Sequence, residues 1–194
     1  MTKERLGVIG VGYVGLVTAA CFAQAGHEVV CLDIDEAKLD QLRAGAAPIH
    51  EPGVEEVLAE GRARMTFTSS AAELFAAAAI AFVSVDSPPS ASGDADLSRV
   101  EAVIDAIPAG TDDAVLVMKS TVPPGTGARL RRSLDERGLD GVAYASNPEF
   151  LREGSAISDF RHPDRVVVGA QEPAVGERIA ALYRDFGGSE LLTD

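Results

Sequence analysis

Cysteine is almost absent from this 194-residue sequence, which has only Cys21 and Cys31. Both lie in apolar stretches, TAACFAQ and EVVCLD, and their spacing matches no metal-binding motif. We therefore expect two buried, reduced thiols, and neither a disulfide framework nor a metal site.

Basic residues are also scarce, because 17 Lys and Arg stand against 30 Asp and Glu, which gives a formal net charge of −13. A nucleic-acid surface needs clustered Lys and Arg, and an anionic membrane attracts the same groups. We therefore expect no nucleic-acid partner and no membrane partner. An anionic ligand would have to be held by local hydrogen-bond donors against an unfavourable overall field.

Long apolar runs are missing, since none approaches the ~20 residues that a membrane-spanning helix requires. The N-terminus, MTKERLGVIG, passes directly into a β-rich run, which predicts that there is no signal peptide. Together with the reduced thiols, these features predict a cytoplasmic location.

What the sequence does have is a regular alternation of strand-like and helix-like segments. Short apolar runs indicate strands at 5–10, 27–33, 64–69, 79–85, 114–121, 142–146, 165–170 and 189–194. Helical spacing is found at 13–26, 35–45, 53–61, 70–78, 96–107, 125–138 and 172–187. The alternation predicts an α/β protein whose doubly wound, mostly parallel sheet carries helices on both faces.

Two irregular segments follow predicted strands at the carboxyl edge of this sheet, where doubly wound folds bind ligands. We interpret 86–95, DSPPSASGDA, as an ordered functional loop rather than a domain linker, because a strong helix resumes at once. The second segment, 147–165, contains two Glu, two Asp, three Arg and a His. It is either a solvated loop or a substrate site.

The segment GVIGVGYVG places Gly10, Gly12 and Gly15 in G-x-G-x-x-G spacing between a predicted strand and a predicted helix, a context typical of dinucleotide binding. Gly10 would permit the tight turn, Gly12 the approach of a pyrophosphate, and Gly15 close packing of helix on strand. The amides expected to face the anion are those of Val11, Gly12, Tyr13 and Val14.

Asp33 ends the second predicted strand, 18 positions after Gly15. A carboxylate here accepts hydrogen bonds from ribose hydroxyls and repels a 2′-phosphate, which favours NAD over NADP. Lys38 would either reach the same ribose or be a solvated helix residue, and Asp35 is expected to cap the helix. A tight glycine turn without a cofactor is the alternative interpretation.

Seven segments occur in the order and spacing of one enzyme family: GVGYVG, LDID, EPGVEEVL, ADLSRVEAV, STVPPGT, NPEFLREGSAISDF and HPDRVVVG. On these motifs the chain resembles the UDP-glucose/GDP-mannose dehydrogenases over essentially all of its length. STVPPGT followed by NPEFLREG is specific, because a generic dinucleotide fold does not carry it. The resemblance implies one Rossmann-type NAD-binding domain over 1–194. Enzymes of this family use two NAD⁺ to oxidise the primary alcohol of a nucleotide sugar to the acid.

The resemblance also implies roles for individual residues. Thr121 and Glu149 would position or activate the water that hydrolyses a thioester intermediate, with the carboxylate taking its proton. The residues expected to hold the sugar are Glu149, Phe150, Leu151, Arg152 and Glu153, of which Glu153 would also lie near the nicotinamide. Further cofactor contacts are expected from Val85, Ser87, Ser120 and Thr121, whereas Asp159, Asp164, Arg165 and His162 are expected to be structural or loop residues.

The family's catalytic Cys lies far downstream, in a sugar-binding domain that follows a helical connector, and Cys21 and Cys31 cannot stand in for it. We therefore expect an N-terminal domain that binds NAD but does not complete the reaction alone. The whole protein is expected to be a homo-oligomer. The loop at 86–95 departs from the family pattern, since Asp86 adds a charge near the expected cofactor.

Two alternatives stay open. UDP-glucose is the substrate expected first, but GDP-mannose or another UDP-sugar remains open because the base-recognising residues lie largely outside this chain. The alternative from another class is a regulatory Rossmann module that senses NAD. Nothing in such a module requires STVPPGT and NPEFLREG at neighbouring strand ends, which favours the enzyme.

Overall fold

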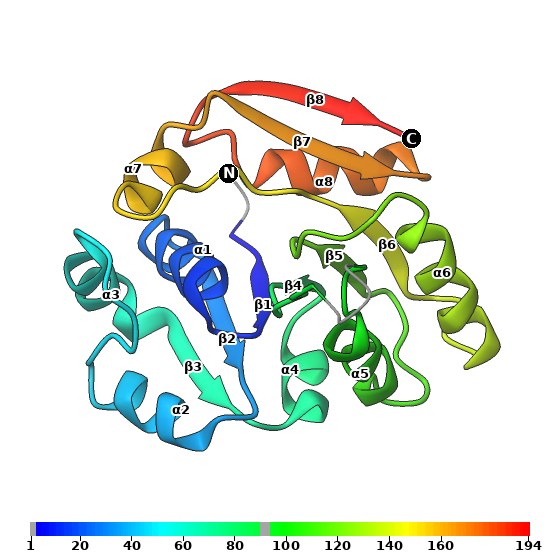
Figure 1. Ribbon diagram of the computed structural model, residues 1–194, viewed down its shortest axis with the longest axis horizontal. Helices are drawn as coiled ribbons and strands as arrows, with labels where there is room; N and C mark the ends of the chain where they lie inside the picture. The colour runs from blue at the N-terminus through cyan, green and yellow to red at the C-terminus, as the bar shows by residue number, and fades with distance from the viewer. Residues whose placement is uncertain (1–2, 90–93) are drawn as a thin grey trace.

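The computed structural model describes residues 3–89 and 94–194, so part of the loop predicted at 86–95 lies outside the described residues. Within them, the strands form one sheet in the order β3-β2-β1-β4-β5-β6-β7-β8 (Figure 1). Their bounds are β1 Arg5–Ile9, β2 Glu28–Leu32, β3 Met65–Thr68, β4 Ile80–Val83, β5 Val115–Met118, β6 Ala143–Ser146, β7 Arg165–Ala170 and β8 Ser189–Thr193. Every neighbouring pair is parallel except β6 with β7, which confirms the predicted mostly parallel sheet.

The helices alternate with these strands as the sequence predicts. Their bounds are α1 Tyr13–Gln24, α2 Glu36–Arg43, α3 Val54–Gly61, α4 Ala71–Ala77, α5 Ser98–Ala106, α6 Thr126–Glu136, α7 Ala156–Arg161 and α8 Pro173–Ala181, with a 3-10 turn at Arg62–Arg64. Asp35 caps α2 as expected, because its carboxylate accepts from the Lys38 amide at 3.2 Å. Ser70 caps α4 in the same way, accepting from the Glu73 amide at 3.3 Å.

Two elements differ from the sequence-based expectation. The segment 147–165 contains helix α7, whose buried residues Ala156, Ile157 and Phe160 give it an apolar face among the charged ones. The helix predicted at 172–187 ends at Ala181, and the chain continues in turns that carry Tyr183 into the core. Short helices and fraying ends have too few periodic positions to be located from spacing alone.

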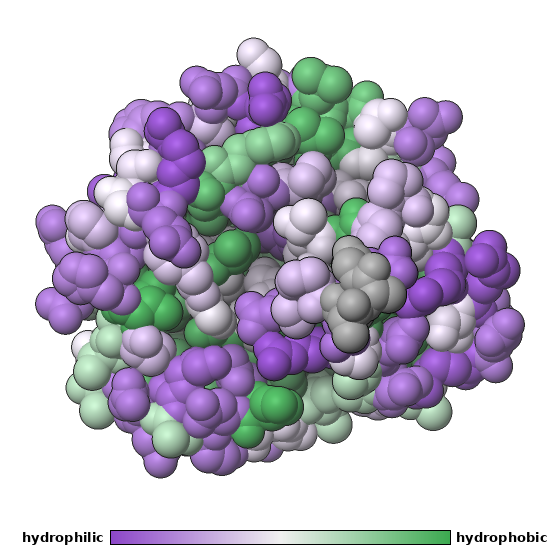
Figure 2. Space-filling model, viewed as in Figure 1, coloured by the Kyte–Doolittle hydropathy of each residue, from purple (hydrophilic) through white to green (hydrophobic). Residues whose placement is uncertain are grey.

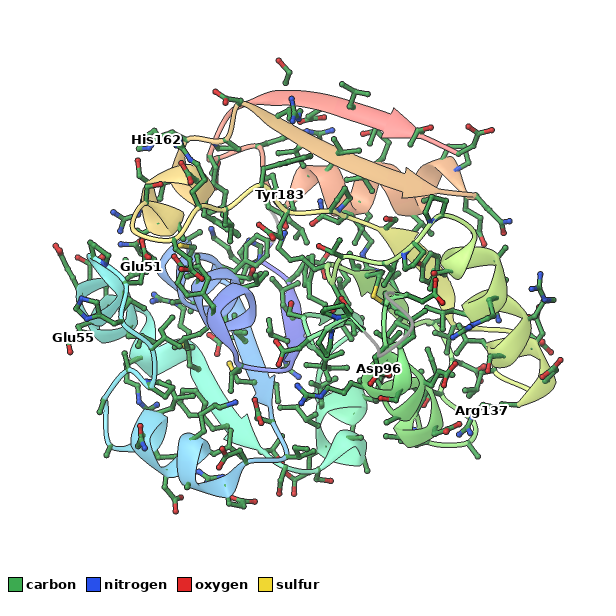
Figure 3. All side chains as sticks on the ribbon, in the orientation of Figure 1. Glu51, Glu55, Asp96, Arg137, His162 and Tyr183 are labelled. Carbon is green, nitrogen blue, oxygen red and sulfur yellow. The ribbon has the colours of Figure 1, made fainter. Side chains whose placement is uncertain are left out.

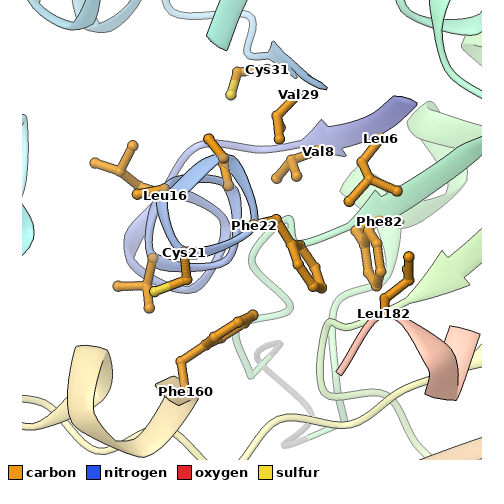
Figure 4. Packing of buried hydrophobic residues seen from close by; sticks show 14 of the residues in the cluster. Leu6, Val8, Leu16, Cys21, Phe22, Val29, Cys31, Phe82, Phe160 and Leu182 are labelled. Atoms are coloured by element: carbon orange, nitrogen blue, oxygen red, sulfur yellow. The ribbon is translucent and has the colours of Figure 1, made fainter. Parts of the chain in front are cut away.

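The core has two layers, one on each face of the sheet. Buried residues of α1, α2, α3, α7 and α8 form one cluster, and those of α4, α5 and α6 form the other. Phe22 of α1 lies at the centre of the first, with ring centroids 5.4 Å from Phe82 and 5.2 Å from Phe160 (Figure 4). Cys21 and Cys31 are free and fully buried, as predicted, and burial raises the pKa of both thiols to about 12.

Most of the face shown in Figure 2 is hydrophilic, and the hydrophobic residues near its upper edge lie over β8. Leu191 and Leu192 of that strand are 53% and 41% exposed. In residues 3–89 and 94–194, none of the helices combines the length and apolarity needed to cross a bilayer.

Candidate functional site

The turn between β1 and α1 has the geometry that the glycine spacing predicts. Gly10 has φ +86°, a left-handed conformation that favours glycine. At Gly15 an added Cβ would lie 1.9 Å from the carbonyl oxygen of Gly10, so only glycine lets α1 approach the turn. At Gly12 an added Cβ would meet nothing closer than an Asp86 oxygen at 4.0 Å. Gly12 therefore faces open space that a ligand could occupy.

Asp33 lies at the end of β2, next to this turn, and is 7% exposed. Its carboxylate accepts from the amides of Val11 at 2.9 Å and Asp35 at 3.0 Å, and pairs with the Lys38 ammonium at 2.9 Å. Burial alone would raise the pKa of Asp33, but these hydrogen bonds outweigh it and hold the pKa below its ordinary value. The carboxylate is therefore ionised at neutral pH.

These contacts refine two sequence-based expectations. Lys38 is not a freely solvated helix residue, because its ammonium is paired with the Asp33 carboxylate. The amide of Val11 binds Asp33 and so is not available to a pyrophosphate. The amides of Gly12, Tyr13 and Val14 are at the start of α1, where helix geometry provides no intrahelical acceptor.

A first cavity of about 380 Å³, the cofactor cavity, lies along this turn. Five residues predicted to bind cofactor line it: Gly10, Gly12, Asp33, Lys38 and Val85. Its other walls include the apolar side chains of Ile34, Phe75 and Val103. The Gly12 amide, the ionised carboxylate of Asp33 and the apolar wall are groups suited to the pyrophosphate, ribose and adenine of a dinucleotide.

A second cavity of about 170 Å³, the junction cavity, adjoins the ends of β4, β5 and β6. It brings together seven predicted site residues: Tyr13, Val14, Val85, Ser87, Ser120, Thr121 and Glu149. The hydroxyl of Ser87 donates to the carbonyl of Thr121 at 2.6 Å, and that of Ser120 donates to the carbonyl of Val85 at 2.6 Å. These bonds tie the loops after β4 and β5 together beside the glycine turn.

A third cavity of about 410 Å³, the substrate-side cavity, lies along segment 147–166. Predicted residues Glu149, Phe150, Leu151 and Arg152 line it, whereas Glu153 is exposed and lies outside the lining of these three cavities. The guanidinium of Arg165 stacks 4.3 Å from the centroid of the Phe150 ring, and the Leu151 amide donates to the Glu149 carboxylate.

The Arg152 side chain is bound to Asp159 by two hydrogen bonds, of 3.1 and 2.6 Å. Hydrogen bonding to Arg152 lowers the pKa of Asp159 to about 2. Asp159 also accepts from the Arg152 amide at 3.0 Å and from the Ser155 hydroxyl at 3.0 Å. Asp159 thus has the structural role expected of it. The Arg152 side chain connects the loop before α7 to Asp159 of that helix.

Comparison with known proteins places this arrangement in a family. The UDP-glucose/GDP-mannose dehydrogenase family, NAD binding domain, matches residues 4–187. This chain belongs to that family. The resemblance and the fold predicted from the sequence are thereby confirmed.

The relatives include the UDP-glucose 6-dehydrogenase of Pseudomonas aeruginosa, 48% identical over 190 residues, which are 94% of this chain and 42% of that protein. A solved UDP-glucose dehydrogenase of Pyrobaculum islandicum is 40% identical with a TM-score of 0.94, covering all of this chain and 46% of that one. A solved GDP-mannose dehydrogenase from Pseudomonas aeruginosa is 31% identical with a TM-score of 0.93, covering 97% of this chain and 46% of that one. The chain spans less than half the length of these relatives.

Lys119, the residue after β5, is a buried polar group of the site that was not predicted from the sequence. Lys119 is buried, and its ammonium lies 3.3 Å from both the Asn147 amide oxygen and the Tyr183 hydroxyl. Burial lowers the pKa of Lys119 to about 8, although the charge of Glu149 acts in the opposite direction. Lys119 lines both the junction and the substrate-side cavity. A lysine inside the apolar run AVLVMKST was the available signal.

Glu51 was also overlooked, although it is buried among hydrogen-bond donors from distant segments. Glu51 opens EPGVEEVL, one of the seven segments that carry the family resemblance, and that was the available signal. The charge of Asp86, which the sequence places near the expected cofactor, is paired with Arg99 of α5.

Proposed function

We propose that this domain supplies the NAD site and part of the catalytic site of a nucleotide-sugar dehydrogenase, in which UDP-glucose is oxidised to UDP-glucuronate. The observation that supports this is the junction cavity. It joins the glycine turn, through Tyr13 and Val14, to Thr121 and Glu149 at neighbouring strand ends. A regulatory NAD module would not need a hydroxyl and a carboxylate beside the expected nicotinamide.

NAD⁺ accepts a hydride when bound, and residues of the cofactor and junction cavities would hold it. Amides of Gly12, Tyr13 and Val14 would bind the pyrophosphate, and Asp33 the ribose. The loop contacts expected from Val85, Ser87 and Ser120 would close the nicotinamide end, because all three line the junction cavity.

Glu149 and Thr121 would act on the water that hydrolyses the thioester formed by the second oxidation. A carboxylate that accepts a proton and a hydroxyl that accepts or donates a hydrogen bond can share one water molecule. Backbone and side chains of 149–152 line the substrate-side cavity next to them, where the sugar would lie. Glu153 remains a predicted contact of sugar and nicotinamide.

The choice of sugar rests on the relatives. UDP-glucose is favoured by the identity of 48% to a UDP-glucose 6-dehydrogenase. GDP-mannose is the second candidate, because the GDP-mannose 6-dehydrogenase of Azotobacter vinelandii is 38% identical over 195 residues. We also propose that the whole protein acts as a homo-oligomer in the cytoplasm, with the remaining catalytic groups outside residues 1–194.

Glu149→Gln in the complete enzyme tests this proposal. The amide cannot accept the proton of water, so steady-state turnover should fall by on the order of 10²–10⁴. The oxidation that precedes thioester hydrolysis should survive, and it should be seen as a stoichiometric burst of NADH in rapid-mixing absorbance measurements. UDP-glucose and GDP-mannose are compared as substrates.

Glu56→Gln on the exposed face of α3 is the control and should turn over like the wild type. Unchanged turnover of Glu149→Gln, or loss of its burst, would contradict the role of Glu149. An unmodified complete protein that binds NAD⁺ but oxidises neither sugar would favour the NAD-sensing module.

A further inference from the structure

Glu51 is a buried carboxylate, 4% exposed, that receives hydrogen bonds from three separate donors. One oxygen accepts from the Tyr13 hydroxyl and from the Gly154 amide at 2.8 Å. The other accepts from the Ala156 amide at 2.8 Å. Buried carboxylates with this many charge-assisted bonds fix the geometry of the groups that surround them.

The three donors belong to the two parts of the proposed site. Tyr13 is the first residue of α1 and its backbone amide is expected to face the cofactor. Gly154 and Ala156 lie directly after the segment expected to hold the sugar. The Tyr13 hydroxyl also lies 3.4 Å from the carbonyl of Arg152, so the same tyrosine contacts that segment directly.

The position of Glu51 between these elements is visible in Figure 3, where it lies beside α1 and the loop leading into α7. Glu55, only one helical turn later in the sequence, is exposed at the outer end of α3 (Figure 3). The two glutamates therefore make a matched pair, one inside the site architecture and one in solvent.

The protonation states of Tyr13 and Glu51 favour the hydrogen bond between them near neutral pH. Burial would raise the pKa of Glu51, but bonds from Tyr13 and the amides of Gly154 and Ala156 hold it below its ordinary value. Burial and the bond to Glu51 raise the pKa of Tyr13 to about 12. Near neutral pH the hydroxyl therefore keeps its proton and the carboxylate keeps its charge.

We propose that Glu51 is a positioning residue that couples the glycine turn to the substrate segment. A dinucleotide bound at the start of α1 would restrict the motion of Tyr13. The Tyr13 hydroxyl would then hold the Glu51 carboxylate through their hydrogen bond, and Glu51 would hold the amides of Gly154 and Ala156. The sugar segment then takes its working geometry when the cofactor is bound. This role rests on the proposed function, because it requires a dinucleotide at the turn.

Amide NMR of this domain, with and without saturating NAD⁺, tests the coupling. In the wild type, the signals of Gly154 and Ala156 should shift on NAD⁺ addition together with that of Gly12. Glu51→Gln should abolish the response at 154 and 156. The glutamine NH₂ group replaces one of the two acceptor oxygens, so hydrogen exchange of the Gly154 or Ala156 amide that faced this oxygen should also accelerate by about tenfold or more.

Two further variants separate the contact of Tyr13 with Glu51 from the binding of the Gly154 and Ala156 amides by Glu51. Tyr13→Phe removes only the hydroxyl, so Gly154 and Ala156 should keep their slow exchange and lose their response to NAD⁺. Glu55→Gln should behave like the wild type in both measurements. If Glu51→Gln fails to fold, Tyr13→Phe decides the coupling alone.

The outcomes distinguish this inference from the proposed function. A wild type in which Gly12 responds to NAD⁺ but Gly154 and Ala156 do not overturns the coupling and leaves the cofactor site standing. A full response in Glu51→Gln or Tyr13→Phe overturns it as well. A wild type in which Gly12 itself does not respond removes the dinucleotide site on which both depend.

Discussion

The glycine turn at 10–15 and the substrate segment at 149–156 meet at the junction cavity but are held in place by different means. The turn depends on backbone geometry, since Gly10 needs a left-handed φ and Gly15 must lack a side chain. The substrate segment depends on side chains, because Glu51 binds amides more than 100 positions away and Asp159 binds Arg152. Substitutions should therefore act on the first through steric overlap and on the second through lost hydrogen bonds.

Gly15→Ala should have the largest effect. Its Cβ would lie 1.9 Å from the Gly10 carbonyl oxygen, so α1 must move away from the turn and from the core around Phe22. We expect a loss of roughly 3 kcal/mol or more in the free energy of unfolding, or failure to fold. Chemical denaturation monitored by circular dichroism measures this, with Gly12→Ala as the control that should lose much less, because its Cβ meets no atom closer than 4.0 Å and only the N-cap preference for glycine is affected.

Gly12→Val should spare the fold and abolish cofactor binding. Gly12 has φ −72°, and an added Cβ meets nothing closer than 4.0 Å, so valine is tolerated by the protein itself. The side chain would fill the space next to the amides that are proposed to bind the pyrophosphate. Calorimetric titration should detect no NAD⁺ binding while the circular dichroism spectrum is unchanged. Normal binding by a folded variant would place the phosphate site elsewhere.

Asp33→Asn should weaken NAD⁺ binding by about tenfold, because a hydrogen bond to a charged acceptor becomes one to a neutral amide. The same change removes the charge that faces a 2′-phosphate, so the ratio of NAD⁺ to NADP⁺ affinity should fall. Parallel titrations with both cofactors measure the ratio. An unaltered ratio would show that another group selects the cofactor.

Lys119 should have a pH-dependent effect on the free energy of unfolding at the junction of the two regions. Its pKa of about 8 in the folded protein lies below its ordinary value, so between pH 8 and 10 the unfolded chain binds more protons than the native one. The contribution of Lys119 to stability should therefore rise with pH over this window, by about 3 kcal/mol at most. Lys119→Met removes this contribution.

Urea denaturation of the wild type and of Lys119→Met at several pH values measures the contribution of Lys119 to the free energy of unfolding. Tyrosines and cysteines titrate in both proteins, so only the difference between them reports on Lys119. The stability advantage of Lys119→Met over the wild type should be largest at pH 8 and shrink toward pH 10. A difference that does not change with pH would mean that Lys119 keeps its ordinary pKa.

The contrast between the two regions also explains what could be predicted from the sequence. The glycine turn, the place of Asp33 at the end of a strand and the mostly parallel α/β sheet follow from local spacing, because Gly10 to Gly15 and the alternating apolar runs each indicate a local structure. Glu51 and Lys119 could not be assigned, because their partners, such as Ala156 and Tyr183, are brought to them only by the folded sheet. Helix α7 could not be predicted from apolar spacing, because its three buried residues lie among charged ones.

The proposed dinucleotide site can be tested on the unmodified domain by calorimetric titration with NAD⁺ and, under identical conditions, with NADP⁺. We expect saturable one-to-one binding of NAD⁺ and clearly weaker binding of NADP⁺, since the ionised carboxylate of Asp33 lies beside the cofactor cavity. Equal affinities for the two cofactors, or no binding of either, would contradict it.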